Sequence, residues 1–298
     1  MAWVKASPVE HYENFPVASW LCPPALRAPI AAIYHFARTA DDIADEGDAS
    51  ADCRLADLAA YRAELMACAA ADVAAGSADA PSKPATRWPQ VFVPLADAIA
   101  QHRLPLNLLA DLLSAFEQDV RKTDAGETYR NRDELLHYCT RSANPVGRLL
   151  LHLWGIDDER SLQQSDTICT ALQLINFWQD LGRDIARGRH YLCDADLAAH
   201  GIRRSTVTPG ADTPATQALV ADLLRWAVTL MHQGAPLALR VPAQAGWRAG
   251  WELRLVVQGG LRVAERIAQG GHRSLSQRPT VGKADLPVLL WRAWRMRG

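Results

Sequence analysis

The sequence predicts an all-α fold, a bundle of long helices that forms a single domain over residues 1–298. Apolar residues recur through most of the chain at the i, i+3, i+4 spacing of helices. Period-two alternation is nearly absent, and no Asn-Gly or Asp-Gly hairpin turn occurs. With 298 residues, 49% of them hydrophobic and 22% charged, the chain has an ordinary globular composition and can bury a sizeable core.

Helical spacing is clearest, in chain order, in residues 24–46, 52–75, 91–121, 132–154, 160–187, 214–240 and 246–269. Two stretches interrupt it. Ala75–Pro89 is rich in Ala, Ser, Gly and Pro, and His200–Pro214 contains Thr208-Pro209-Gly210, so both are predicted to be loops. Because the helices around Ala75–Pro89 have the pattern of one bundle, we expect a surface loop there rather than a linker between domains.

Charge is distributed unevenly along the chain. The formal net charge is −1, which argues against a dedicated nucleic-acid-binding protein. Residues 240–298 carry 11 Arg or Lys against three acids, whereas residues 1–239 carry 21 against 30. This asymmetry suits an anionic small substrate or docking on an anionic membrane surface. A solvated basic helix face would explain it equally well.

The sequence predicts a cytoplasmic protein. It has no apolar run of the roughly 18 residues needed to span a membrane, and its N-terminus lacks the pattern of a signal peptide. The six cysteines form no Cys-x-x-Cys pair, so we expect reduced thiols. Near the C-terminus, residues 291–297 alternate aromatic and basic groups, which would suit peripheral contact with the inner membrane face or ordinary packing of a helix end.

Two acid-rich segments stand out from the helical pattern. In the first, Asp41 and Asp45 are four residues apart, as are Asp42 and Glu46, so each pair lies on one face of a helix. Like charges at this spacing destabilise a helix unless something neutralises them. A single pair of this kind is usually a solvated helix face.

The second segment follows an apolar run, Leu172–Ile175, that should be buried. Asn176, Asp180 and Asp184 stack on one helix face over two turns. A carboxylate ladder that rises from a core helix is costly without a partner. Two such clusters far apart in the chain favour a shared ligand over two solvated faces.

The donor atoms of both ladders favour Mg²⁺. Carboxylate and amide oxygens are hard ligands, and neither ladder contains His or Cys, which argues against zinc or copper. Ladders facing each other across a bundle would clamp a diphosphate through Mg²⁺ and promote its departure. A di-iron bundle would need Glu-x-x-His pairs, which neither ladder contains.

These segments resemble the two motifs of the squalene/phytoene synthase family, and the resemblance covers about residues 11–280. The first motif runs from Tyr34 to Asp45 and the second from Asn176 to Tyr191. The resemblance implies an isoprenoid-synthase-type helical bundle in which the two motifs bind Mg²⁺ on either side of a central cavity. It implies that the substrate is a prenyl diphosphate.

The resemblance also implies roles for single residues. The implied metal ligands are Asp41, Asp45, Asn176, Asp180 and Asp184. Tyr34 and Arg38 join Asp41, Asp45, Asp180 and Asp184 as catalytic residues. The implied contacts to substrate come from His11, Asn14, Arg38, Arg189 and Tyr191.

Within the family, the chain is similar to the hydroxysqualene synthase branch. The shared segments are Glu13–Ser19, Asp41–Gly47, Ser142–Arg148, Asn176–Asp180 and Gln258–Arg262. That branch converts presqualene diphosphate and water into hydroxysqualene and diphosphate without NADPH. The resemblance therefore predicts Mg²⁺ as the cofactor, no NADPH, and hand-over of the intermediate from a presqualene diphosphate synthase.

Capture of water requires a positioned polar group in a dry pocket. The candidates are Thr140, Asn144, Gln179 and Gln258, each of which could equally be a structural hydrogen bonder. Gln179 stands where the family usually has Arg, Thr140 where a tyrosine is common, and Tyr12 and Asn14 where serines are usual. These departures weaken the case for condensation of two farnesyl diphosphates and suit an enzyme that accepts the preformed cyclopropyl intermediate.

Three other functions stay open on the sequence. A condensing squalene or phytoene synthase would use farnesyl or geranylgeranyl diphosphate. A class I terpene cyclase would have Ser or Thr where this chain has Asp180. A helical assembly factor that has lost catalysis would be expected to have lost aspartates from the clusters, but both clusters are complete here.

Overall fold

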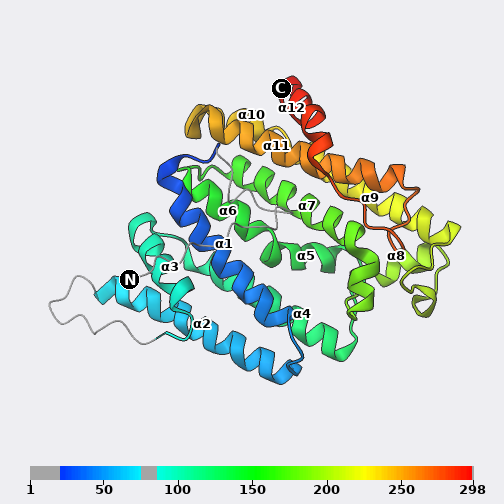
Figure 1. Ribbon diagram of the computed structural model, residues 1–298, viewed down its shortest axis with the longest axis horizontal. Coiled ribbons are helices and arrows are strands. Elements are labelled where there is room, and N and C mark those ends of the chain that lie inside the picture. The colour runs from blue at the N-terminus through cyan, green and yellow to red at the C-terminus, as the bar shows by residue number, and fades with distance from the viewer. Residues whose placement is uncertain (1–20, 75–85, 297–298) are drawn as a thin grey trace.

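The computed structural model describes residues 21–74 and 86–296 (Figure 1). Within these ranges the regular elements are all helices, which confirms the predicted all-α fold. His11 and Asn14 lie outside the described residues. The α-helices are α1 (Pro24–Asp45), α2 (Ala51–Ala74), α3 (Pro89–His102), α4 (Leu106–Ala125), α5 (Arg132–Ser142), α6 (Asn144–Leu153), α7 (Glu159–Ala186), α8 (Asp194–Ala199), α9 (Pro214–Gly234), α10 (Leu237–Arg240), α11 (Pro242–Gln269) and α12 (Leu286–Arg295). Two short 3₁₀ turns, η1 (Arg204–Thr206) and η2 (Lys283–Asp285), join them.

Three predicted helices form as single elements, namely α1, α2 and α7. The predicted single helix over 91–121 is wrong, because α3 and α4 are separated at Arg103, whose φ of 51° is left-handed. Pro105 follows directly and caps α4. A left-handed residue ends a helix, and a proline cannot donate the next backbone hydrogen bond.

Proline also divides two further predicted helices. The segment 132–154 is split at Ala143 into α5 and α6, with a proline in the first turn of α6. The segment 214–240 is split into α9 and α10 just before Leu237, where Pro236 precedes the new helix. The last predicted helix begins earlier, at Pro242, and kinks at Gly246, whose φ is 84°. Helical periodicity continues across each break, because both halves face the same core.

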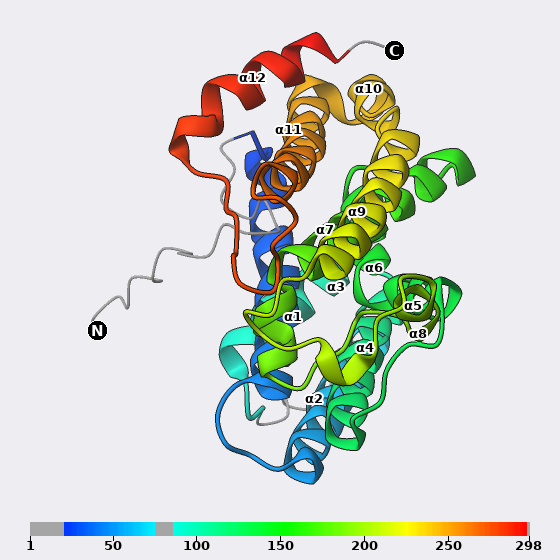
Figure 2. The ribbon, with the colours of Figure 1, turned by 90° about the vertical axis from the view of Figure 1, so that its right-hand side faces the viewer.

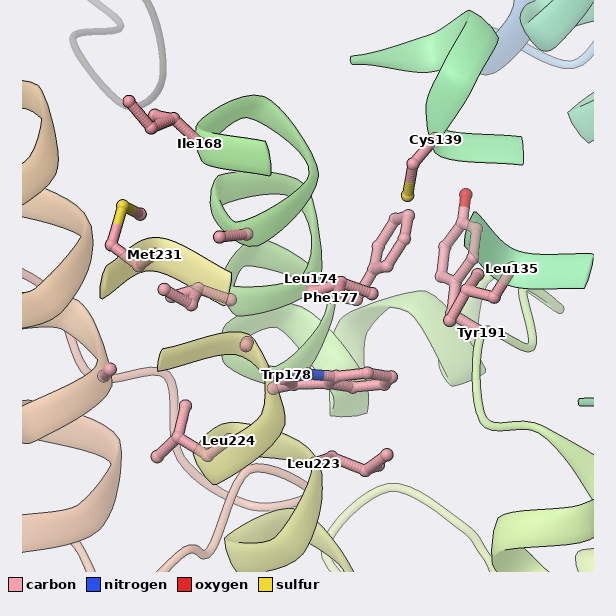
Figure 3. Packing of buried hydrophobic residues seen from close by; sticks show 14 of the residues in the cluster. Leu135, Cys139, Ile168, Leu174, Phe177, Trp178, Tyr191, Leu223, Leu224 and Met231 are labelled. Atoms are coloured by element: carbon pink, nitrogen blue, oxygen red, sulfur yellow. The ribbon is translucent and has the colours of Figure 1, made fainter. Parts of the chain in front are cut away.

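α7 is the central helix of the bundle, and α9, α6 and α11 all contact it (Figures 1 and 2). Its Trp178 is fully buried beside Leu223 and Leu224 of α9 (Figure 3). On the neighbouring side, Phe177 stacks on Tyr191 with ring centroids 3.7 Å apart. Full burial of large apolar side chains of this kind contributes about 2–3 kcal/mol each, so α7 is a rigid support for the acids that it carries.

A second hydrophobic cluster joins α1, α2, α3 and α4, with Phe36, Tyr61 and Phe92 in mutual ring contact. Leu149 of α6 belongs to this cluster, whereas Leu151 of the same helix belongs to the cluster around α7. α6 therefore connects the two packed regions and fixes α1 relative to α7.

After α11, residues 271–282 run back along α7; we call them the return segment. The amide of Gly182 on α7 donates to the carbonyl of Ser274 over 3.0 Å. A Cβ atom at Gly182 would lie 2.3 Å from the carbonyl oxygen of Leu275, so only glycine allows this approach. The carboxylate of Asp212 also holds the return segment in place, because it accepts hydrogen bonds from the backbone amides of Leu275 and Ser276.

Candidate active site

α1 carries the first acid ladder at its C-terminal end. Arg38 bridges two of its acids, with 3.0 Å to a carboxylate oxygen of Asp41 and 2.7 Å to one of Asp42. Asp45 forms an ion pair with Arg189, which follows α7 in the chain. Burial, and then the negative charge of Asp45, raise the pKa of Asp41 to about 7. Arg38 and Arg189 act in the opposite direction without cancelling this rise.

α7 carries the second ladder. The Asn176 amide donates to Asp180 over 3.2 Å. The guanidinium of Arg278, in the return segment, donates to both carboxylate oxygens of Asp180. Its Nε donates to Oδ1, and its Nη2 donates to Oδ2 over 3.2 Å. Burial raises the pKa of Asp184 to about 7, and the charges of Asp180 and Asp45 act in the same direction. Asp184 is thus close enough to the first ladder to be affected by it.

Arg189 lies where the two ladders meet. Its guanidinium pairs with Asp45 and also opposes the rise in the pKa values of Asp41 and Asp184. A cavity of about 450 Å³ opens at this point between the ends of α1, α4 and α7. Acids and arginines dominate its polar lining, with Asp45, Glu46, Asp119, Asp124, Arg54, Arg187 and Arg189. Such a lining suits a charged head group rather than a hydrocarbon chain.

Asp119 of α4 is a site residue that the sequence analysis missed. It lines the same cavity and accepts a hydrogen bond from the hydroxyl of Tyr138. Burial raises its pKa to about 7, although Tyr138 and Arg189 act in the opposite direction. The sequence does contain a signal for Asp119. Leu112 and Ala115 are buried on α4, and Asp119 follows them at the i, i+3, i+7 spacing of one helix face. An acid therefore stands in the apolar stripe of this helix.

The side chains around the cavity fit Mg²⁺ by their chemistry. Hard oxygen donors predominate. Burial raises the pKa of Asp119, which lines the cavity, and the pKa values of Asp41 and Asp184, which belong to the ladders but are not among the lining residues. A bound cation would favour the charged form of such carboxyls. Within residues 21–74 and 86–296, however, no group of three or more His, Cys, Asp or Glu side chains is already arranged to hold a metal ion. Arg189 and Arg278 hold Asp45 and Asp180 instead.

The predicted water-positioning residues are distributed over four helices, α5, α6, α7 and α11. Thr140 is exposed on α5, and its hydroxyl donates to the carbonyl of His137 over 2.7 Å. Asn144, at the start of α6, accepts from Thr170 over 2.9 Å. Gln179 donates to the carbonyl of Pro279 over 2.7 Å. Gln258 is buried on α11.

Two predicted tyrosines differ in their surroundings. Tyr191 is buried between Phe177 and the rings of Tyr129 and Tyr138. Figure 3 shows it beside Phe177, which extends toward it from α7. Tyr34 is half-buried on α1, one turn before Arg38. The aromatic group of Tyr129, Tyr138, Tyr191 and Phe177 is buried, its rings packed against one another, and the Tyr138 hydroxyl connects it to Asp119 of the cavity.

Comparison with known proteins gives consistent findings. A family model described as squalene/phytoene synthase matches residues 9–285. A hydroxysqualene synthase of Rhodopseudomonas palustris is 34% identical over 82% of this chain and 75% of its own length. A hydroxysqualene synthase of Sinorhizobium fredii is 37% identical over 63% of this chain and 58% of its own length.

A solved structure of a squalene synthase from Alicyclobacillus acidocaldarius superimposes with a TM-score of 0.72. It is 34% identical and covers 88% of this chain and 90% of its own. A dehydrosqualene synthase structure, at 21% identity and a TM-score of 0.69, has the same fold. The relatives at 34% identity carry different product names, so similarity by itself leaves the last chemical step open.

Proposed function

The chain belongs to the squalene/phytoene synthase family, and on that premise we propose that it converts presqualene diphosphate and water into hydroxysqualene and diphosphate. The observation that carries this proposal is the meeting of the α1 and α7 acid ladders at Arg189, which lines a polar cavity together with Asp45 of the first ladder. The hydroxysqualene synthase relatives, at 34–39% identity, support the choice of product.

In the proposed reaction the carbon–oxygen bond of presqualene diphosphate breaks, and its electron pair leaves with the diphosphate. The cyclopropylcarbinyl cation rearranges, a water oxygen bonds to the resulting cation, and one proton is released. Mg²⁺ held by Asp41, Asp45, Asn176, Asp180 and Asp184 would supply charge neutralisation for the leaving group. No reductant enters this balance, which agrees with the expectation that NADPH is not used.

The residues of the chain contribute positioning and charge. We propose that Arg38 and Arg189 bind the leaving diphosphate through charge-assisted hydrogen bonds. Binding there requires each guanidinium to exchange its present carboxylate partner for a phosphate oxygen. The aromatic group of Tyr129, Tyr138, Tyr191 and Phe177 would face the cation once the diphosphate has left.

No described helix is long and apolar enough to cross a bilayer. We propose a cytoplasmic enzyme that receives presqualene diphosphate from a preceding synthase and contacts the inner membrane face peripherally. A C30 alcohol is almost insoluble in water, so a bilayer is the natural acceptor of the product.

The test is incubation of the purified chain with presqualene diphosphate, Mg²⁺ and isotopically labelled water, without reductant, followed by mass analysis. We expect hydroxysqualene carrying the label. Parallel incubations with NADPH, with farnesyl diphosphate and with geranylgeranyl diphosphate separate the alternatives. Squalene formed only with NADPH, or a condensation or cyclisation product from the shorter diphosphates, would overturn the proposal.

Site variants extend the same assay. Asp41→Asn and Asp180→Asn should abolish turnover while leaving the helical circular dichroism unchanged. Asp57→Asn is the matched control, because Asp57 is exposed on α2 and pairs with Arg87 away from the cavity. Full activity in EDTA would reject the role of the divalent cation.

A further inference from the structure

Exposed apolar side chains gather on the last two helices. Of the seven large apolar side chains that are markedly exposed among the described residues, five belong to α11 and α12. We call these five the α11–α12 face: Trp247, Leu286, Leu290, Trp291 and Trp294. Trp291 and Trp294 are 53% and 62% exposed. Single exposed apolar residues are ordinary, but a concentration at one end of a molecule marks an interaction surface.

The orientation of α12 is the reverse of that expected for a surface helix, whose apolar side normally faces the core. Leu286, Leu290 and Trp294 follow at four-residue intervals, so they share one helix face, and all three are exposed. Ala293 is the only buried residue of the helix. Figures 1 and 2 show α12 on the outer side of α11.

Polar contacts attach α12 to the rest of the protein. Just before the helix, Asp285 is buried and pairs with Arg262 and Arg266 of α11, each over 2.7 Å. Within the helix, Arg292 pairs with Glu265. These ion pairs and the small apolar contact of Ala293 hold the inner side of α12, whereas Leu286, Leu290 and Trp294 are left exposed on its outer side.

Positive charge accompanies the exposed tryptophans. Arg295 lies 4.9 Å from the ring centroid of Trp291, and Arg248 lies 5.5 Å from that of Trp247. Neither arginine is within ion-pair distance of an acid in the part of the chain that the structure describes. Tryptophan beside an unpaired arginine is the combination found at the head-group level of membranes, where arginine meets lipid phosphate.

We propose that the α11–α12 face docks on an anionic lipid bilayer. α12 would lie in the plane of the interface, with Leu286, Leu290 and Trp294 toward the acyl chains and Arg295 at the phosphates. The proposal rests on the proposed function for its purpose, since the lipid product needs an acceptor. Its test requires neither substrate nor turnover, so the docking surface and the proposed reaction can fail separately.

The test is flotation of the full chain with two kinds of vesicle, phosphatidylcholine alone and phosphatidylcholine mixed with phosphatidylglycerol. We expect flotation with the mixed vesicles, weaker flotation with the neutral ones, and release by high salt. Trp291→Ala combined with Trp294→Ala should lower the partition coefficient about tenfold or more, and Arg295→Gln about fivefold. Met66→Ala is the matched control, because Met66 is 49% exposed on α2 and should have no effect.

Circular dichroism and the thermal midpoint of each variant show whether the fold is retained, which we expect because the replaced side chains are exposed. Wild-type protein that stays in solution with anionic vesicles would overturn the proposal. So would a tryptophan double variant that is folded and floats like the wild type. Light scattering provides the remaining outcome: a dimer that the same double variant dissociates, without vesicle binding, would show that the face is covered by a second copy of the chain.

Discussion

Replacement of Asp119 by asparagine tests whether the cavity stores unneutralised negative charge. Asparagine has nearly the same shape and keeps an oxygen that can accept from the Tyr138 hydroxyl. The substitution therefore removes the charge with little change in packing. We expect Asp119→Asn to be more stable than the wild type at alkaline pH in the absence of divalent cations, and to lose its advantage in acid.

The magnitude follows from the raised pKa of Asp119. The pKa rises from 3.8 to about 7 on folding, and one pKa unit corresponds to about 1.4 kcal/mol, so the upper bound is about 4 kcal/mol. Because Asp119 is only partly buried and lines the cavity, solvent screening reduces this, and we expect about 2 kcal/mol. A carboxyl with a raised pKa binds its proton more tightly when folded. The contribution of the Asp119 carboxyl to the free energy of unfolding of the wild type is therefore fully present below about pH 4 and is lost as the pH rises through about 7.

The assay is urea unfolding of both proteins in EDTA at several values between pH 5 and pH 8. The free energy of unfolding of Asp119→Asn minus that of the wild type should rise with pH by about 1–2 kcal/mol over this range. Asp57→Asn, at an exposed position on α2, should show a flat difference. A flat difference for Asp119→Asn as well would refute the argument that Asp119 is a desolvated charge.

Three further predictions concern the return segment and the metal site. Gly182→Ala should destabilise the protein by about 1–3 kcal/mol in urea unfolding, because its Cβ would meet the Leu275 carbonyl. The control is Gly259→Ala on α11, where a Cβ would face open space, and it should be neutral or stabilising by up to about 1 kcal/mol. Equal effects of the two substitutions would contradict the argument from close packing at Gly182. The Arg278→Gln variant should bind Mg²⁺ several-fold more tightly than the wild type in calorimetry, because the substitution removes the guanidinium that pairs with Asp180. Arg273→Gln, at an exposed position of the same segment, is the control. Unchanged Mg²⁺ affinity of Arg278→Gln would count against Asp180 as a metal ligand. Mg²⁺ should raise the thermal midpoint of the wild type more at pH 8 than at pH 5, because at the lower pH protons compete with Mg²⁺ for the carboxyls of Asp41, Asp119 and Asp184. A rise of the midpoint that does not depend on pH would contradict binding of Mg²⁺ by these carboxyls.

The sequence was sufficient for the helical class and for the two acid ladders, because both depend on local spacing. Asp41 and Asp45, or Asp180 and Asp184, must share a face once their segments are helical. The helix breaks at Arg103, Ala143 and Pro236 were missed because helical periodicity continues across them. Local pattern indicates which side of a helix is buried, but a left-handed residue or a proline decides where that helix ends.

Contacts between distant segments could not be predicted from spacing. Asp119 was overlooked because a lone acid on an amphipathic helix carries no motif. Arg278 was overlooked because its partner, Asp180, lies 98 residues earlier in the chain. Gln179 was proposed to position water, yet its amide bonds to the Pro279 carbonyl, next to Arg278. A glutamine that anchors a backbone and one that orients a ligand look the same in a sequence.

The long separation between Asp180 and Arg278 has a consequence for biosynthesis. During translation, α7 leaves the ribosome well before the arginine that contacts its aspartate has been made. Until then the acid face of α7 lacks this counter-charge and the backbone contact between Gly182 and Ser274. A nascent chain that stops short of residue 278 would therefore contain nearly every core residue of the described structure and still lack the cation that neutralises Asp180.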